Sequence, residues 1–136
     1  MLVDLKGLRV GPVIPVSDLA TSLEFYDGVL GLTGEAAPGG YELRAGAGTK
    51  LFLLTDTDYA GQAEWPLAAF EATDLSSVID DLHRRGVRLE IMGTDDPYPT
   101  DERGIADLGD VLIAWFRDPD NQVFSVFQRK TPTSTS

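Results

Sequence analysis

The 136-residue sequence contains no cysteine and a single histidine, His83. The lack of cysteine excludes disulfides, thiolate metal sites and cysteine nucleophiles together. An iron site built from two histidines and one carboxylate also cannot come from one such chain. We interpret His83 as a solvated position near the end of a predicted helix, where positive charge is favoured, in preference to a general base or a ligand.

Basic residues and long apolar runs are scarce as well. Eleven Lys and Arg against 22 Asp and Glu give a formal net charge of −11, which argues against a nucleic-acid partner because phosphates must be neutralised. No apolar run approaches the roughly 20 residues that cross a bilayer, and the N-terminal stretch lacks the layout of a signal peptide. We therefore expect a cytoplasmic protein with no membrane partner. The acidic balance is compatible with a cationic ligand, or with solubility alone.

The sequence does contain one pattern twice, 56 residues apart (74 − 18). Asp18 and Asp74 stand where helix N-caps belong, because a carboxylate can accept the free amide hydrogens of a first turn. In each copy apolar residues then recur at helical spacing until a glycine ends the run. These residues are Leu19, Leu23, Tyr26, Leu30 and Gly31 in the first copy, and Leu75, Val78, Ile79, Leu82 and Gly86 in the second. The pattern predicts helices over 18–30 and 75–85.

Alternating and apolar segments around these helices predict a β-α-β-β-β module twice. The expected strands are 8–16, 32–37, 41–45 and 50–54 in the first module, and 66–73, 87–92, 111–117 and 122–128 in the second. The predicted boundaries are 1–56 for the first module, 57–65 for a connector, 66–129 for the second module and 130–136 for a disordered tail. Pro12 and Pro15 remove ladder donors, so the first strand should lie at a sheet edge or at a module junction.

Two acidic features of the second half have both a functional and a plain interpretation. Residues 93–109 form a loop longer than usual, which could close over a cationic guest or bind Ca²⁺ weakly, although such a run is more often solvated. Asp118 and Asp120 could form a pair of carboxylates for acid–base work. We favour a turn between two strands, with Pro119 fixing the bend.

Two sequence motifs stand out near the two ends of the predicted modules. They are Val16-Ser17-Asp18-Leu19 with Ser22, Phe25-Tyr26 and Leu30-Gly31-Leu32, and Phe116-Arg117-Asp118-Pro119-Asp120. These motifs and their spacing resemble the vicinal oxygen chelate superfamily, which includes glyoxalase I, extradiol dioxygenases, fosfomycin-modifying enzymes and the bleomycin resistance proteins. The resemblance covers roughly residues 7–129. It implies an α+β fold in which two β-α-β-β-β modules form an open, U-shaped mixed sheet around a cleft, usually within a homodimer.

Enzymes of this superfamily hold a divalent metal in the cleft through His, Glu or Gln on the first and last strands of each module. The resemblance places Gly11, Phe52, Leu67 and Ser125 at the corresponding positions. None of the four is an ordinary ligand of that kind, and a shift by two, which keeps the strand face, rebuilds no cluster. We therefore expect no metal, no other cofactor and no catalytic residue.

The family's strand register also predicts which side chains line the cleft. The ligand-binding candidates are Val13, Phe52, Leu67, Glu71, Trp115, Ser125 and Phe127, with Ala69 beside them. Ile14, Leu51, Leu53, Phe70, Phe116, Phe124 and Val126 would pack beneath the helices on the opposite face. The cleft would then be apolar and aromatic with Glu71 as its main charge, which suits a flat organic molecule carrying a positive group. Alternatively, these side chains fill the cleft or contact a dimer partner and bind nothing.

Three hypotheses about function follow. The first is a metal-free protein like the bleomycin resistance proteins, which sequesters a cationic or aromatic compound. The second is a lyase, isomerase or dioxygenase of the superfamily with an atypical site, or a metal-free one in which Glu71 acts as acid–base. The third is a non-catalytic interaction module. Metal binding separates the second from the others, and ligand-dependent thermal stabilisation separates the first from the third.

Overall fold

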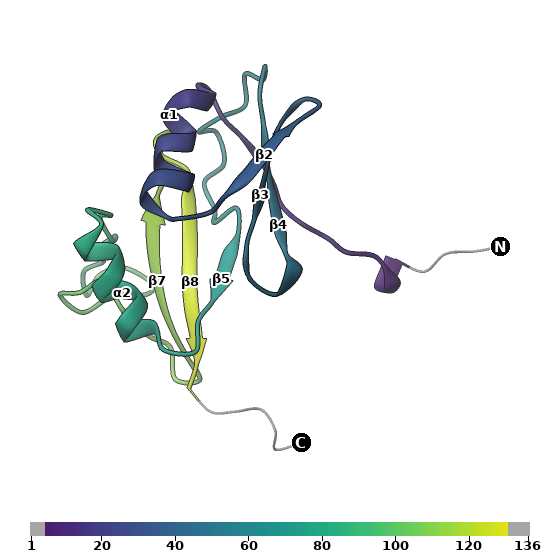
Figure 1. Cartoon of the computed structure of the whole chain (residues 1–136). Coiled ribbons are helices and arrows are strands. Elements are labelled where there is room, and N and C mark those ends of the chain that lie inside the picture. The colour runs from purple at the N-terminus through teal and green to yellow at the C-terminus, as the bar shows by residue number, and fades with distance from the viewer. Residues whose placement is uncertain (1–4, 131–136) are drawn as a thin grey trace. The chain divides into compact units, whose positions relative to one another are not determined.

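The computed structural model describes residues 5–130, which form two compact units (Figure 1). One unit ends at Gln62 and the other begins at Ala63, so the division falls inside the segment expected to be a connector. Each unit contains a four-stranded mixed sheet with helical segments, which confirms the predicted α+β fold class. No helix in the described part of the chain is long and apolar enough to cross a membrane.

The first unit begins with an arm, residues 5–12, that contains a short 3-10 turn at Leu5–Gly7. Its sheet has the order β1-β4-β3-β2, with β1 parallel to β4 and the other pairs antiparallel. The elements are β1 (Val13–Pro15), α1 (Leu19–Leu23), a π-helical segment (Glu24–Val29), β2 (Gly34–Ala37), β3 (Gly40–Arg44), a 3-10 turn (Gly46–Gly48) and β4 (Lys50–Leu54).

The first strand lies at the edge of this sheet, as its two prolines predict. It is shorter than the expected 8–16, because Pro12 offers only its carbonyl, which accepts a hydrogen bond from the Phe52 amide at 3.0 Å. Ile14, Leu51 and Leu53 are buried on one face, whereas Val13 on the other face is 57% exposed. The predicted alternation of faces is therefore confirmed for this sheet.

Both predicted helix caps are confirmed. Asp18 accepts hydrogen bonds from the Ala20 amide at 3.2 Å and the Thr21 hydroxyl at 3.0 Å. Asp74 accepts from the amide and the hydroxyl of Ser77, at 3.4 and 2.7 Å. Thr21 and Ser77 are 56 residues apart, like the two caps, so the repeat extends one turn into each helix.

The two helices differ by one residue after this first turn. Gly31 and Gly86 follow them with φ of 80° and 82°, but these glycines are only 55 residues apart (86 − 31). The difference lies in the π-helical segment, where the Leu30 amide donates to the Phe25 carbonyl, five residues back, at 2.9 Å. A π-turn contains one residue more than an α-turn. The first helix therefore accommodates an insertion without changing its ends.

The second unit has the sheet order β5-β8-β7-β6, with β5 parallel to β8 and the other pairs antiparallel. Helix α2 lies against one face of this sheet and buries Leu75, Ile79 and Leu82 (Figure 1). The elements are β5 (Ala69–Glu71), α2 (Leu75–Arg84), β6 (Ala106–Asp107), β7 (Val111–Arg117) and β8 (Val123–Arg129).

Three phenylalanines pack together on the buried side of this sheet. The rings of Phe116 and Phe124 stack with centroids 5.6 Å apart, and Phe70 lies 6.4 Å from each of them. All three belong to the set that the sequence predicts beneath a helix. Trp115 has the opposite parity along β7, so its side chain belongs to the other face.

The expected strand over 87–92 is wrong, and the expected strand over 66–73 shrinks to β5. Leu89 makes only an isolated bridge with Phe116, and the Glu90 amide donates to the Trp115 carbonyl at 2.8 Å. Met92 then leaves the edge of β7, because both its amide and its carbonyl are bonded to Thr100. Farther along the same edge β6 pairs with β7 instead. Two short segments thus share the edge that one strand was expected to fill.

The loop expected over 93–109 consequently contains the strand β6. At the end of the chain, the Lys130 amide donates to the Asp110 carbonyl at 2.9 Å, and its ammonium lies 2.7 Å from the Asp107 carboxylate. Lys130 therefore belongs with the sheet and not with the expected disordered tail. The remainder of that tail, 131–136, lies outside the described residues.

Candidate functional site

One face of the second sheet brings together five of the seven predicted ligand-binding residues. Neighbouring strands align Ala69, Ser125 and Trp115 in one row and Glu71, Phe127 and Ile113 in the next. Residues directly opposite one another in adjacent strands project from the same face. The Leu67 amide continues the pattern by donating to the Val123 carbonyl at 2.9 Å. The five are Leu67, Glu71, Trp115, Ser125 and Phe127, and we call this surface the Trp115 face.

The other two candidates, Val13 and Phe52, lie opposite each other in the first unit. Glu42 faces Phe52 in the next strand, and Glu35 faces Glu42 in the strand beyond. Lys50 lies 3.2 Å from the carboxylate of Glu42. These charges were not predicted from the sequence. The alternation of charged and apolar residues in Tyr41-Glu42-Leu43-Arg44 could have predicted them, because it places Glu42 on the face opposite Leu43. The face that carries Phe52 is more polar than predicted.

The Trp115 face has an aromatic partner that sequence reasoning also missed. The ring of Tyr98 lies 6.4 Å from that of Trp115, with an interplanar angle of 32°, and Tyr98 is 54% exposed. Tyr98 comes from the loop before β6, and no periodic pattern assigns a loop side chain to a sheet face. Together with Phe127, these rings make an aromatic surface on one side of the sheet.

Tyr98 is held on a short flap, residues 93–99. Hydrogen bonds between Met92 and Thr100 close its base, with the Thr100 amide 3.0 Å from the Met92 carbonyl. Inside the flap the Gly93 amide donates to the Asp96 carboxylate at 2.6 Å. A loop closed at its ends and bonded internally keeps a defined shape.

The segment that follows the flap is fixed to α2 by Arg103. Its guanidinium donates to the Ser76 hydroxyl at 3.0 Å and the Ser76 carbonyl at 2.9 Å, and it pairs with Asp80 at 2.6 Å. Gly104, with φ of 93°, packs so closely that an added Cβ would lie 2.8 Å from the Leu89 side chain. These contacts connect the position of Tyr98 to the helix on the other face of the sheet.

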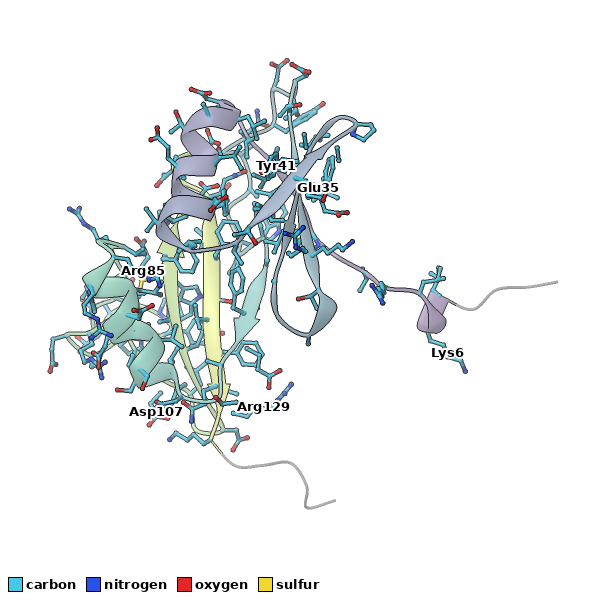
Figure 2. All side chains as sticks on the ribbon, viewed as in Figure 1. Lys6, Glu35, Tyr41, Arg85, Asp107 and Arg129 are labelled. Atoms are coloured by element: carbon cyan, nitrogen blue, oxygen red, sulfur yellow. The ribbon has the colours of Figure 1, made fainter. Side chains whose placement is uncertain are left out.

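Glu71 is not the lone charge that the sequence predicts. The Arg129 guanidinium lies 2.6 Å from its carboxylate and 5.6 Å from the centre of the Phe127 ring (Figure 2 labels Arg129). Both side chains of the pair are about half exposed, at 53% and 52%, so the pair contributes little to stability. A cationic ligand at Glu71 would share the carboxylate with Arg129, whose charge already balances it. The face is therefore aromatic with a nearly neutral polar end.

Several carboxylates of the second unit accept hydrogen bonds from nearby backbone amides. Asp118 is 6% exposed, and one of its oxygens accepts from the amides of Asp120 and Gln122 at 2.9 and 2.8 Å, which confirms the predicted turn. In the loop before β6, Asp101 likewise accepts from the amides of Arg103 and Ile105. The Asp107 carboxylate accepts from Lys130, and this hydrogen bond, with one from the Gly109 amide, lowers its pKa. This loop therefore uses acidic side chains to cap its own backbone.

The four positions that the resemblance assigns to a metal do not fit one. Their side chains supply a single hydroxyl, from Ser125, and no imidazole or carboxylate. Gly11 lies so close to β4 that an added Cβ would meet the Lys50 carbonyl at 2.5 Å. Within residues 5–130, no three His, Asp or Glu side chains come together as a metal site would need. His83 is exposed in the last turn of α2.

The comparison with solved structures finds the same fold repeatedly. TnmS3, an antibiotic binding protein from Streptomyces sp. CB03234, is 21% identical with a TM-score of 0.63, over 96% of this chain and 99% of that one. The oxidase ChaP-H2 is 18% identical with a TM-score of 0.63, over 95% of both chains. A glyoxalase/bleomycin resistance protein/dioxygenase from Alicyclobacillus acidocaldarius is 15% identical with a TM-score of 0.66, over 94% and 96%. At these identities the likeness shows the fold alone.

Sequence comparison identifies the family directly. No curated protein matches the sequence. The profile of one family does match residues 9–126, which is most of the chain and extends from the arm before β1 into β8. The chain therefore belongs to the Glyoxalase/Bleomycin resistance protein/Dioxygenase superfamily.

Proposed function

We propose that this protein binds a flat aromatic small molecule on the Trp115 face without transforming it. The observation that carries the proposal is the pair of rings from Tyr98 and Trp115, whose centroids lie 6.4 Å apart, with Tyr98 54% exposed. Centroids about 4.5–7 Å apart are those of two aromatic rings in contact. A flat aromatic guest would extend this pair by stacking against its exposed side.

The polar end of the face refines the expected ligand. Because Glu71 is paired with Arg129, stacking and apolar contact supply the affinity, and a positive group on the ligand adds little. That TnmS3 binds an antibiotic supports a binding role on this fold. Ligand identity on a shared fold depends on the site, which is why the proposal rests on the rings.

A catalytic role is the second candidate, and its support is the oxidase among the structural neighbours. In this chain it would need either metal ligands outside the four expected positions or Glu71 as an acid–base group. Glu71 would first have to leave Arg129. A non-catalytic interaction module is the third candidate, in which the Trp115 face is covered by another protein surface.

The experiment is a titration of purified protein with acridine, anthraquinone-2-sulfonate and naphthalene, followed by tryptophan fluorescence and thermal melts. We expect at least one probe to raise the melting temperature, and Trp115→Ala or Tyr98→Ala to weaken its binding by about tenfold, as loss of about 1.4 kcal/mol of stacking implies. The matched control is Trp65→Ala, which removes a tryptophan that is 64% exposed in the connector.

Three outcomes would contradict this account. Unchanged affinity in Trp115→Ala would show that the Trp115 face is not the site. The lack of any stabilising probe would favour the interaction module. Conversion of a bound probe into a product would favour the enzyme, and Glu71→Gln would then test the acid–base role.

We also propose that two copies of the chain form a homodimer. Support comes from the arm, where Leu5 is 81% exposed and Leu8 is 55% exposed. Sedimentation at several concentrations should show a dimer that Leu8→Asp weakens. Leu108→Asp, at a residue 45% exposed in the second unit, is the control. A monomer at all concentrations would contradict the proposal.

A further inference from the structure

A hollow lies in the first unit, between its arm and one of its hairpins. It has a volume of about 330 Å³ and is bounded by Arg9, Val10 and Gly11 of the arm and by residues 47–50 of the β3–β4 hairpin. This volume lies at the lower end of the range for small-molecule sites, about 300–1,000 Å³. The hollow depends on Gly11, because any larger residue would collide with the Lys50 carbonyl.

The charge around this hollow is opposite to that of the whole molecule. Its ionisable lining residues, Arg9 and Lys50, are both cationic, although the formal net charge of the chain is −11. Lys50 already pairs with Glu42 at 3.2 Å, but an ammonium has further donors. Arg9 makes no ion pair with any residue of the described range 5–130. The uncompensated positive charge at this hollow therefore comes from Arg9.

The hairpin turn forms the other wall of the hollow and has a fixed shape. The Thr49 amide donates to the Gly46 carbonyl at 3.1 Å, and the two residues between them, Ala47 and Gly48, have φ of 57° and 76°. The charge of Glu42, the acidic residue paired with Lys50, is balanced by that lysine. Charges farther away than about 8 Å are screened at physiological salt.

We propose that this hollow binds a small molecule that carries an oxyanion group, a carboxylate or a phosphate, with Arg9 as its charged anchor. The guanidinium forms paired hydrogen bonds with either group, because its planar fork matches two oxygens. The exposed side chain of Val10, which also lines the hollow, contacts the apolar part of such a molecule. This site is independent of the aromatic ligand proposed for the second unit.

The test is calorimetric titration of the full chain with inorganic phosphate and with benzoate, at constant ionic strength set by sodium chloride. We expect saturable binding of at least one of them and a loss of about tenfold or more in Arg9→Gln. The control is Arg88→Gln, which removes the same charge from an exposed arginine. Gly11→Ala should also weaken binding, since it obstructs the hollow without changing any charge.

The pattern of results decides both the proposal and the source of the anion. Binding of phosphate alone indicates a phosphorylated ligand, and binding of benzoate alone indicates a carboxylic acid. Trp115→Ala should bind either anion as tightly as the wild type does, so a failure at the aromatic face leaves this site in place. Equal affinity in Arg9→Gln and the wild type, or no binding at millimolar concentrations, overturns the proposal.

Discussion

Ser22 is a buried polar residue in the second half of α1. It is 1% exposed, and its hydroxyl has no hydrogen-bond partner among the residues that the structure describes. A buried hydroxyl without a partner costs about 1–3 kcal/mol, because it has lost its bonds to water. The residue thus weakens the first unit in the folded state.

We therefore expect Ser22→Ala to raise the free energy of unfolding by about 0.5–1 kcal/mol, since it removes that cost and leaves almost no cavity. Urea unfolding measures the change. Ser77→Ala is the matched comparison, because its hydroxyl is bonded to Asp74, and it should lose about 0.5 kcal/mol. Equal destabilisation by both substitutions would mean that Ser22 has a partner in solution.

Contacts between residues close in the sequence were easier to predict than contacts between residues far apart. The caps Asp18 and Asp74 were predictable because a cap and its amide lie within three residues of each other. The pairing of Glu71 with Arg129 was missed because these residues are 58 positions apart. The alternation of side chains along a strand could have predicted this pair, because Arg129 lies two residues after Phe127 and so projects from the same face of the sheet.

Among the structural elements, the flap depends most clearly on a single side chain, that of Arg103. Arg103 fixes the segment behind it through three hydrogen bonds to Ser76 and Asp80. Because Tyr98 lies on the flap, Arg103 positions a ring that it does not touch. The segment from the flap to β6 can hold Tyr98 in place only if Arg103, at its other end, is itself fixed.

We predict that Arg103→Ala increases amide hydrogen exchange in residues 93–105 and weakens aromatic-probe binding several-fold, since the flap must then be ordered on binding. Exchange mass spectrometry and the fluorescence titration measure the two effects. Arg84→Ala is the control, as that side chain is 72% exposed and makes a longer contact of 3.7 Å with Asp81. Unchanged exchange in the flap would show that Arg103 does not hold it.

Elements with strong local patterns were predicted well, including β4 over 50–54 and β7 over 111–117. The strand expected over 87–92 failed because its existence depends on a partner and not on its own composition. Val87 and Leu89 are buried as a strand pattern predicts, yet β7 offers that stretch only part of its edge. Whether a segment pairs as a strand depends on its neighbours in the sheet, and the segment's own sequence does not specify those neighbours.

At the scale of the whole molecule, the many carboxylates make stability depend on pH. The pKa of Asp74 is held below its ordinary value of 3.8 by the hydroxyl and then the amide of Ser77. A carboxyl whose pKa is depressed by folding stabilises the protein above that ordinary value, and the benefit is lost as pH falls through the folded pKa. The same sign holds for Asp107, whose pKa is lowered by Lys130.

We predict that Asp74→Asn lowers the melting temperature at pH 7 and that the difference from the wild type shrinks as the pH falls below 3.8. Asparagine still caps the helix, so the substitution removes only the charge. Calorimetric scans between pH 3 and pH 7 give the comparison. A difference that stays constant across this range would mean that the charge of Asp74 has no part in stability.

The single inserted residue in the π-helical segment limits how the two halves can be recombined. A chimera that exchanges residues 18–23 with 74–79 keeps every later position in phase, because both copies are the same length there. An exchange extended past residue 24 changes the helix length by one, which rotates the downstream chain by about 100° about the helix axis. The two copies of the repeat are therefore not interchangeable beyond this point.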